Sequence, residues 1–339
     1  MRSEDLPAPD RFQWWREQCA KGVVPTVASS PHAGDFRATV TFAELGPLQL
    51  SVLTFPEVRA VRTPALVRRS DPEEYGLSLI TANDLWFAQR DRDCRLEPGR
   101  LLLHDTSQPF DSRALPGSGP GGMLMLQIPR TALPLRPRRL DQLLARGLPT
   151  RAGMDAILAR YLTGVADAVE NGEVGEREAG QLGRTALDLV AATLATHLGD
   201  EEHLTPETRR QALLARIEAF IELNLGDPEL TPTTIAAHHH ISPAYLHRLF
   251  QPRELTVAAW IRHQRLERAR VDLADPRQRL RPVHAIAARW GFRHPAEFSR
   301  TFRTAHGVPP SDYRHHALTA GTTEPDRRAP APRPVATPG

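Results

Sequence analysis

Cysteine and long apolar runs are scarce in this chain of 339 residues. The two cysteines, Cys19 and Cys94, form no CxxC motif, so we exclude a disulfide scaffold and interpret both as reduced thiols. No apolar stretch approaches the ~20 residues that a membrane-spanning helix requires. The N-terminus lacks the charged-then-apolar pattern of an export signal. These absences predict a cytoplasmic protein that has no membrane partner.

The common sequence signatures of catalysis are also missing. The chain contains no GxSxG, Walker A or GxGxxG motif, which argues against the common hydrolases, nucleotidases and dinucleotide-dependent enzymes. The length suits two domains better than one, because single cores stop growing at about 250–300 residues.

Basic charge is concentrated in one part of the chain. The net charge is +3, and Lys21 is the single lysine, so arginine in place of lysine is a general property of the composition. Between residues 226 and 318 there are 14 Arg against 8 Asp or Glu, which leaves +6 there and about −3 elsewhere. A basic domain joined to a mildly acidic one fits a phosphate-backbone partner for the basic part.

Two helix-turn-helix units stand in tandem in this basic part. The first spans Thr231 to Phe250 and the second Arg281 to Arg314. Each has a short helix with small residues, a turn, and a second helix. Ser242 followed by Pro243 caps and opens the second helix of the first unit, and Pro295 opens that of the second unit. The polar residues left over face outward together, as a reader of the DNA major groove requires.

A long helix joins the two units, and its sequence completes a recognisable set of motifs. The set comprises SPAYLHRLF from Ser242, WIRHQRLERAR from Trp260, Gly291-Phe292, FSRTF from Phe298 and GVPPSDYR from Gly307. This region resembles the DNA-binding domain of the AraC/XylS family of bacterial transcription regulators. The resemblance implies binding to double-stranded promoter DNA, RNA polymerase as a further partner, and activation rather than repression.

Two positions depart from the family pattern. His240 stands in the turn of the first unit where the family usually has glycine. A positive φ there would cost a non-glycine residue some stability, although histidine tolerates it better than most. The run from Gln251 to Leu255 replaces a segment that usually contains glycine. Both departures concern local turn geometry.

The resemblance also predicts how DNA is read. We expect the linking helix, Val257 to Leu273, to hold the two second helices about one duplex turn, roughly 34 Å, apart. Arg248 and Arg300 are the first candidates, either bidentate to guanine or on a phosphate, with an internal salt bridge as the alternative. The full set of predicted DNA-binding residues is Ala244, His247, Arg248, Arg293, His294, Ala296, Ser299, Arg300 and Arg303, the last of these on phosphate.

The N-terminal half carries a different pattern. Residues 10–21 predict a short amphipathic helix, and residues 36–128 show short runs of β-branched and apolar residues separated by turn signals. This pattern is typical of an antiparallel barrel or jelly roll, and its last strands resemble the cupin-like sensory domain of the same family. The predicted fold class is therefore α+β: a cupin-like antiparallel β-barrel with flanking helices, then an all-α domain with two helix-turn-helix units.

Two amphipathic helices, Met154–Val169 and Glu176–Leu198, follow the barrel. The apolar stripe of the second helix either forms a homodimer contact or packs on its own barrel. The predicted organisation is a sensory and dimerisation domain at 1–200, a linker at 201–208, a DNA-binding domain at 209–318 and a disordered tail at 319–339.

The sequence gives little support for a metal site, a cofactor or an enzymatic activity. The run from His238 to His240 cannot place three imidazoles on one ion, so we predict no metal site and no cofactor. Cys94 lies in DRDCRLEPG, which we interpret as a charged turn with no histidine to activate a nucleophile. An enzyme-linked regulator, with a catalytic N-terminal domain, remains the alternative function.

A barrel without catalytic residues suits a small-molecule sensor. Candidate lining residues on the predicted strands are Arg62, Tyr75, Trp86 and His104, each of which is equally compatible with packing or solvent exposure. A regulator without an effector is the rival hypothesis, and the presence or absence of a cavity inside the barrel distinguishes them.

Overall fold

The computed structural model describes residues 2–199, 204–251 and 255–320. These residues divide into two compact units, residues 1–216 and 217–339, described separately below. No helix in the described ranges has the length and apolar character needed to cross a membrane. Most of the predicted disordered tail, residues 321–339, lies outside the described part, and residues 319 and 320 end a helix instead.

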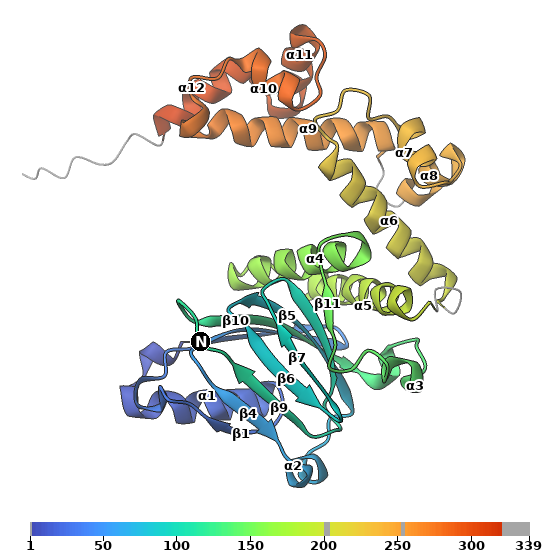
Figure 1. Ribbon diagram of the computed structural model, residues 1–339. Coiled ribbons are helices and arrows are strands. Elements are labelled where there is room, and N and C mark those ends of the chain that lie inside the picture. Colours follow the sequence, from blue (N-terminus) through green and yellow to red (C-terminus); the bar gives the residue numbers. More distant parts are fainter. Residues whose placement is uncertain (1, 200–203, 252–254, 321–339) are drawn as a thin grey trace, which may run out of the picture. The chain divides into compact units, whose positions relative to one another are not determined.

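The N-terminal unit is built on two antiparallel sheets that face each other (Figure 1). The six-stranded sheet has the order β11 (Gly147–Pro149), β8 (Arg100–Asp105), β5 (Glu74–Ala82), β10 (Gly121–Pro129), β3 (Leu48–Phe55) and β2 (Thr39–Leu45). The five-stranded sheet has the order β1 (Val27–Ser29), β4 (Arg59–Arg62), β9 (Phe110–Ala114), β6 (Leu85–Gln89) and β7 (Arg92–Leu96). The predicted antiparallel, cupin-like architecture is confirmed, with one correction: the sheets form a sandwich and not a closed barrel, because their strands pair only within each sheet.

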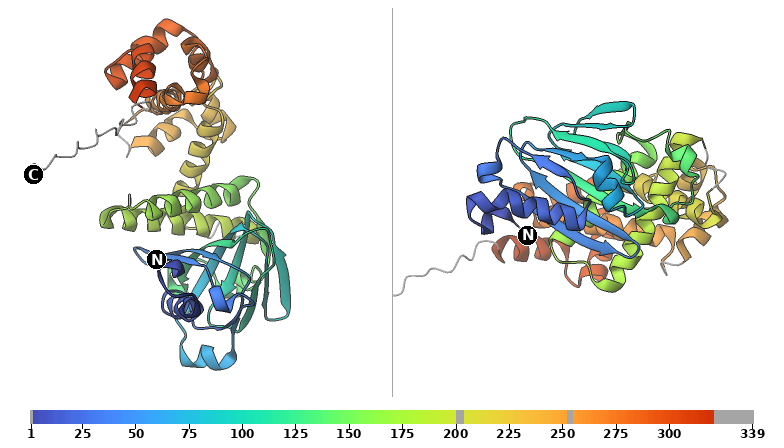
Figure 2. Two further views of the ribbon diagram at one scale, coloured as in Figure 1. Left: turned by 90° about the vertical axis from the view of Figure 1, so that its left-hand side faces the viewer. Right: turned by 90° about the horizontal axis from the view of Figure 1, so that it is seen from below.

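Both faces of the six-stranded sheet are buried, and strand alternation divides them. On β8, Leu101 and Leu103 point to one core while Leu102 and His104 point to the other. The first core lies under helices α4 (Gly153–Glu170) and α5 (Glu176–Leu198). The second core lies between the two sheets and is closed at one side by helix α1 (Ala8–Gly22), which is seen from below in Figure 2.

The apolar stripe of α5 belongs to the core of its own unit. Val190, Leu194 and Leu198 are buried against α4 and the six-stranded sheet, and Leu187 is half-buried beside them. The Tyr161 hydroxyl donates to the Leu182 carbonyl at 2.8 Å and ties α4 to α5. The stripe is therefore covered by its own sandwich, which corrects the hypothesis that it forms the homodimer contact.

The structure also differs from the predicted linker at 201–208. Residues 201–203 lie outside the described part, and residue 206 already begins helix α6 (Pro206–Leu223). Leu204 and Ala212 are buried in the N-terminal core, so the described chain from residue 204 onward packs against that core. The division between the units accordingly falls within α6, after Arg216, and not at residue 208.

The C-terminal unit is all helical. After α6 come α7 (Pro232–His238), α8 (Pro243–Phe250), α9 (Val257–Ala274), α10 (Val283–Arg289), α11 (Pro295–His306) and α12 (Pro310–Ala320). Helix α9 runs along both helix-turn-helix units: α8 contacts it in the first unit, and α10 and α12 contact it in the second (Figure 1). Leu266, Ala269 and Leu273 of α9 pack on the core of the second unit. The predicted all-α domain with two helix-turn-helix units joined by one long helix is confirmed.

Candidate nucleic-acid interface

The first helix-turn-helix unit consists of α7 and α8. The Ser242 hydroxyl accepts a hydrogen bond from the Tyr245 backbone N–H at 3.1 Å, so Ser242 caps α8 as predicted, with Pro243 in the first turn. Ile235 and Ala236 of α7 are buried, as is Leu246 of α8. The small side chain of Ala236 lets the two helices cross closely, and α8 is left with its polar side facing solvent.

The turn between α7 and α8 contains the first departure from the family pattern. His240 has a φ of +54°, the left-handed conformation that glycine adopts without penalty. The equivalent turn of the second unit has Gly291, with a φ of +74°. His240 thus carries a positive φ in this turn, and residues 252–254, in the second departure, lie outside the described part.

The second unit consists of α10 and α11. Pro295 opens α11, and Phe298 and Phe302 on its inner side are buried. The carboxylate of Asp272 on α9 accepts hydrogen bonds from the Trp290 indole N–H and the Gln278 amide, both at 2.9 Å. This buried carboxylate anchors the turn of the second unit to the linking helix.

All nine residues predicted to bind DNA are exposed in the C-terminal unit. Those of the first unit lie on α8, and those of the second lie on α11 and in the turn before it. Arg248 and Arg300 each stand five residues after the proline that opens their helix. Neither forms an ion pair with another described residue, so the described structure gives no support to an internal salt bridge at either arginine. Arg248 instead lies over the Tyr245 ring, with its guanidinium carbon 5.2 Å from the ring centroid.

Arg293 differs from the other candidates because it has an acidic partner. Its guanidinium is ion-paired with Glu229, which lies before α7. Both side chains are more than half exposed, so the pair is screened by solvent and contributes little to stability. Arg293 therefore joins the second helix-turn-helix unit to the loop that leads into the first, a role that sequence reasoning did not foresee.

Arg265 and two glycines hold the α6–α7 loop against α9 and the second helix-turn-helix unit. Arg265 of α9 donates through Nε to the Leu225 carbonyl at 2.9 Å and through Nη2 to the Asp227 carbonyl at 2.5 Å. A Cβ on Gly226 would lie 2.7 Å from the Arg289 carbonyl oxygen, and one on Gly291 would lie 2.8 Å from the Leu225 carbonyl oxygen. Backbone of the α6–α7 loop, which leads into the first helix-turn-helix unit, thus touches backbone of the second helix-turn-helix unit. We name Arg265, Gly226 and Gly291 the interunit clasp.

The histidine run has aromatic partners. The His238 ring stacks on Phe220 with centroids 4.0 Å apart, and His239 meets the same ring edge-on at 5.4 Å. Among the described residues, no group of three or more His, Cys, Asp or Glu side chains is placed to hold a metal ion.

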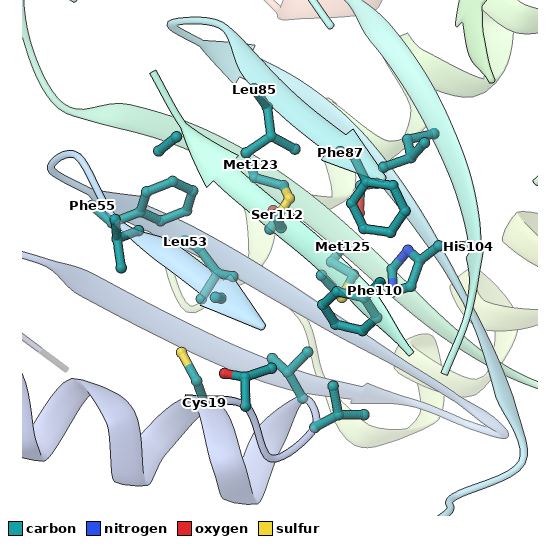
Figure 3. Close-up of a pocket in the computed structure, with 18 of the residues that line it drawn as sticks. Cys19, Leu53, Phe55, Leu85, Phe87, His104, Phe110, Ser112, Met123 and Met125 are labelled. Carbon is teal, nitrogen blue, oxygen red and sulfur yellow. The ribbon is translucent and has the colours of Figure 1, made fainter. Parts of the chain in front are cut away.

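A cavity of about 90 Å³ lies between the two sheets and α1 in the N-terminal unit (Figure 3). Of the four lining residues suggested by the sequence, His104 alone borders it. Tyr75 points to the opposite core, and buried Arg62 donates to backbone carbonyls, including that of Thr106 at 2.7 Å. Trp86 is half-buried and donates to Asp93 at 3.1 Å.

Cys94 lies on β7, which corrects its interpretation as part of a turn.

Burial controls the protonation of His104. Desolvation lowers its pKa from 6.5 to about 4, against the opposing influence of neighbouring Asp105, while the cation Arg62 adds to the lowering. Its imidazole is neutral at physiological pH. The ring occupies space opposite Gly76, its antiparallel partner on β5, where any Cβ would overlap it.

The lowered pKa of His104 predicts a loss of stability in acid. In the unfolded chain the imidazole takes up a proton below about pH 6.5, whereas the folded chain resists until about pH 4. The contribution of His104 is therefore fully present above pH 6.5 and falls by on the order of 3 kcal/mol as the pH drops to 4. Urea unfolding of wild type and of His104→Phe across this range measures it. Equal pH slopes in the two proteins would contradict the prediction.

Family models match both units of this chain. Residues 15–195 match a family model described as an AraC-binding-like domain, and residues 235–316 match a helix-turn-helix domain model. The transcriptional activator NphR of Rhodococcus sp is 28% identical over 279 residues, which cover 82% of this chain and 80% of that protein. The transcriptional activator RhrA of Rhizobium meliloti is 26% identical over 299 residues, covering 86% and 88%. The crystal structure of the AraC-like transcriptional activator CuxR aligns with 79% of this chain and 93% of its own, at a TM-score of 0.49 and 24% identity.

Proposed function

The chain belongs to the AraC family of DNA-binding transcription regulators, and from this premise we propose that it activates transcription by placing α8 and α11 in successive major-groove segments of promoter DNA. The observation that carries the proposal is the pair Arg248 and Arg300. They occupy equivalent positions on the two second helices, are exposed, and lack an acidic partner among the described residues. Arginine in such a position reads guanine through two parallel hydrogen bonds.

Helix α9 sets the separation of the two readers. It spans 18 residues and is therefore about 27 Å long, a length comparable with the roughly 34 Å of one duplex turn. The remaining candidates divide between base edges and backbone. Ala244 and Ala296, each one residue after the opening proline, suit contact with a thymine methyl group, and Arg303 suits a phosphate.

In this proposal the N-terminal sandwich is the small-molecule sensor. Its cavity supports a sensory role over a regulator that responds to DNA alone. An effector that binds one conformation better than another shifts the population between them, and so changes DNA binding. Activation at a promoter implies RNA polymerase as a partner and a cytoplasmic location. We also propose a homodimer, whose interface lies outside the buried stripe of α5.

The relatives give no support to the enzyme-linked alternative. NphR and RhrA are both named as transcriptional activators, and each is similar to this chain across both units. The proposal therefore assigns the N-terminal unit to ligand sensing and not to catalysis.

Recovery of the DNA fragments that the full-length protein binds, across its own genome, tests the DNA-reading proposal. We expect one shared motif with two blocks whose centres are about ten base pairs apart, because each second helix reads one major-groove segment. A motif with a single block, or binding without any motif, would contradict tandem reading.

A further inference from the structure

The cavity in the N-terminal unit has a composition that restricts what can bind in it. Its walls are mainly aliphatic and aromatic side chains, with Phe87, Phe110 and Met125 among them (Figure 3). None of the described residues that line it is an Arg, Lys, Asp or Glu. A charged ligand would lose its hydration there without gaining a counter-charge, so an uncharged ligand is favoured.

His104 brings a buried polar group to this apolar space. Its ring points into the cavity beside Phe87 and Phe110, with centroid distances of 5.3 Å and 5.5 Å (Figure 3). The side chain is 2% exposed, and its Nδ1 has no hydrogen-bond partner among the described residues. The indole Nε1 of Trp15, another residue of the cavity wall, is likewise buried and unpartnered within the described part.

Such unpartnered atoms are rare in folded proteins, because each forfeits the hydrogen bonds it makes to water. The space that His104 occupies depends on Gly76, since a side chain at that position would overlap the imidazole. The structure therefore accommodates a buried imidazole while leaving one of its nitrogens without a partner in the described ranges. A ligand that hydrogen-bonds to this nitrogen would satisfy it.

The volume of the cavity limits the size of the ligand. At about 90 Å³ it is smaller than the engineered cavity of ~150 Å³ that holds benzene. Met123 and Met125 both border it, and the flexible thioether side chain adapts to an irregular occupant. A single ring is therefore the upper limit, reached when these methionine side chains shift.

We propose that this cavity binds an uncharged molecule no larger than one ring, whose polar group is a hydroxyl paired with His104. A hydroxyl both donates and accepts, so it pairs with an imidazole nitrogen in either tautomer and with an indole N–H. This inference rests on the proposed sensory function and adds the chemical class of the effector to it.

Isothermal calorimetry on the full-length protein without DNA tests the ligand class, with phenol, toluene and benzoate as probes. Phenol and toluene differ in that a hydroxyl replaces a methyl group, and benzoate adds a charge. We expect phenol to bind about tenfold more tightly than toluene, the worth of one neutral hydrogen bond. We expect benzoate to bind at least about tenfold more weakly than phenol, because its charge is desolvated without a partner. This wild-type series does not depend on any variant folding.

His104→Phe then isolates the hydrogen bond. It should reduce phenol binding to the level of toluene binding and leave toluene binding within about threefold of wild type. Tyr75→Phe is the matched control, because it removes a hydroxyl from the opposite face of the same sheet. Its phenol-to-toluene ratio should stay at the wild-type value.

Three outcomes would overturn the inference: benzoate binding as tightly as phenol, a phenol-to-toluene ratio unchanged in His104→Phe, or no phenol binding by folded protein. Fluorescence anisotropy with the recovered DNA motif, measured on the same sample, separates this failure from that of the proposed function. Protein that binds the motif but not phenol has a different effector class. Protein that binds phenol but no motif contradicts the DNA-reading proposal.

Discussion

Replacing Arg248 and Arg300 together with alanine is expected to weaken binding to the two-block motif by about 2–6 kcal/mol, roughly 30-fold to 20,000-fold. Each arginine that pairs bidentately with guanine contributes about 1–3 kcal/mol of discrimination against the wrong base. Both side chains are exposed and without an acidic partner in the described structure, so their removal leaves no buried charge behind. The stability of the C-terminal unit should therefore stay within about 0.5 kcal/mol of wild type.

Fluorescence anisotropy at one fixed salt concentration measures this loss. Arg248→Ala alone should abolish discrimination in one block of the motif, and Arg300→Ala alone in the other. Arg279→Ala is the control, because this exposed arginine lies after α9, outside both second helices. If the double variant loses the same factor on random DNA as on the motif, the two arginines contact phosphates and other residues read the bases.

Lysine at the same positions refines the assignment. Lysine keeps the positive charge but lacks the planar fork that matches two acceptors on guanine. Arg248→Lys and Arg300→Lys should restore binding to random DNA while leaving most of the discrimination lost. Full recovery of the motif preference by lysine would indicate that charge alone suffices.

Local signals make the C-terminal unit predictable. The Ser242 cap, the helix-opening prolines and the helical periodicity of the linking helix act within a few residues of one another, and the observed helix bounds follow them closely. The helix predicted at Glu176–Leu198 has the same bounds in the structure for the same reason. Such signals do not state what covers an apolar stripe, which is why the sequence leaves the packing of α5 ambiguous.

Long-range pairing limits the prediction of the N-terminal unit. Strand β7 resembles a turn in sequence because Arg92, Asp93 and Arg95 dominate it. Its alternation appears only when burial is known, with Leu96 and half-buried Cys94 facing inward. Whether sheets close into a barrel depends on pairing between distant strands, which local patterns do not encode.

The candidate DNA-binding site likewise has features that the sequence predicts and features that only the structure shows. Exposed positions on α8 and α11 follow from helix phase, and the seven predicted DNA-binding residues on these helices are exposed, as are Arg293 and His294 in the turn before α11. The contacts that join the two helix-turn-helix units depend on residues far apart in sequence. Arg265 lies 40 positions from Leu225, whose carbonyl it binds. The RLERA motif contains the arginine at position 265, but only the structure assigns it to the interunit clasp.

The interunit clasp leads to the second large effect, that of Gly291→Ala. Alanine at a φ of +74° is disfavoured by about 1–2 kcal/mol. Its Cβ would also lie 2.8 Å from both the Leu225 carbonyl oxygen and the Arg265 guanidinium carbon, and overpacking of this kind typically adds about 1–3 kcal/mol. The C-terminal unit should therefore lose roughly 2–5 kcal/mol of stability. Hydrogen exchange of the amides in α10 and α11 measures this local loss.

Two other glycines separate the two causes. Gly307 has a φ of +80°, and no described atom lies within 4 Å of where its Cβ would stand, so Gly307→Ala should show only the conformational penalty of about 1–2 kcal/mol. Gly226 lacks a positive φ, but its Cβ would meet the Arg289 carbonyl oxygen at 2.7 Å, so Gly226→Ala should show only the steric penalty. Gly291→Ala is expected to exceed each of them.

Spacing variants of the DNA motif connect the clasp to function. Because Gly226 and Gly291 bring the backbone that leads into the first helix-turn-helix unit into contact with that of the second, the wild-type protein should tolerate poorly a motif lengthened or shortened by one base pair. Gly226→Ala should push the two helix-turn-helix units apart. The affinity of this variant for DNA should therefore fall most for the original spacing and should depend less on spacing overall. If Gly226→Ala keeps the wild-type spacing preference, or if Gly291→Ala is no more destabilising than Gly307→Ala, then α9 alone sets the distance between the readers and the clasp contributes nothing to recognition.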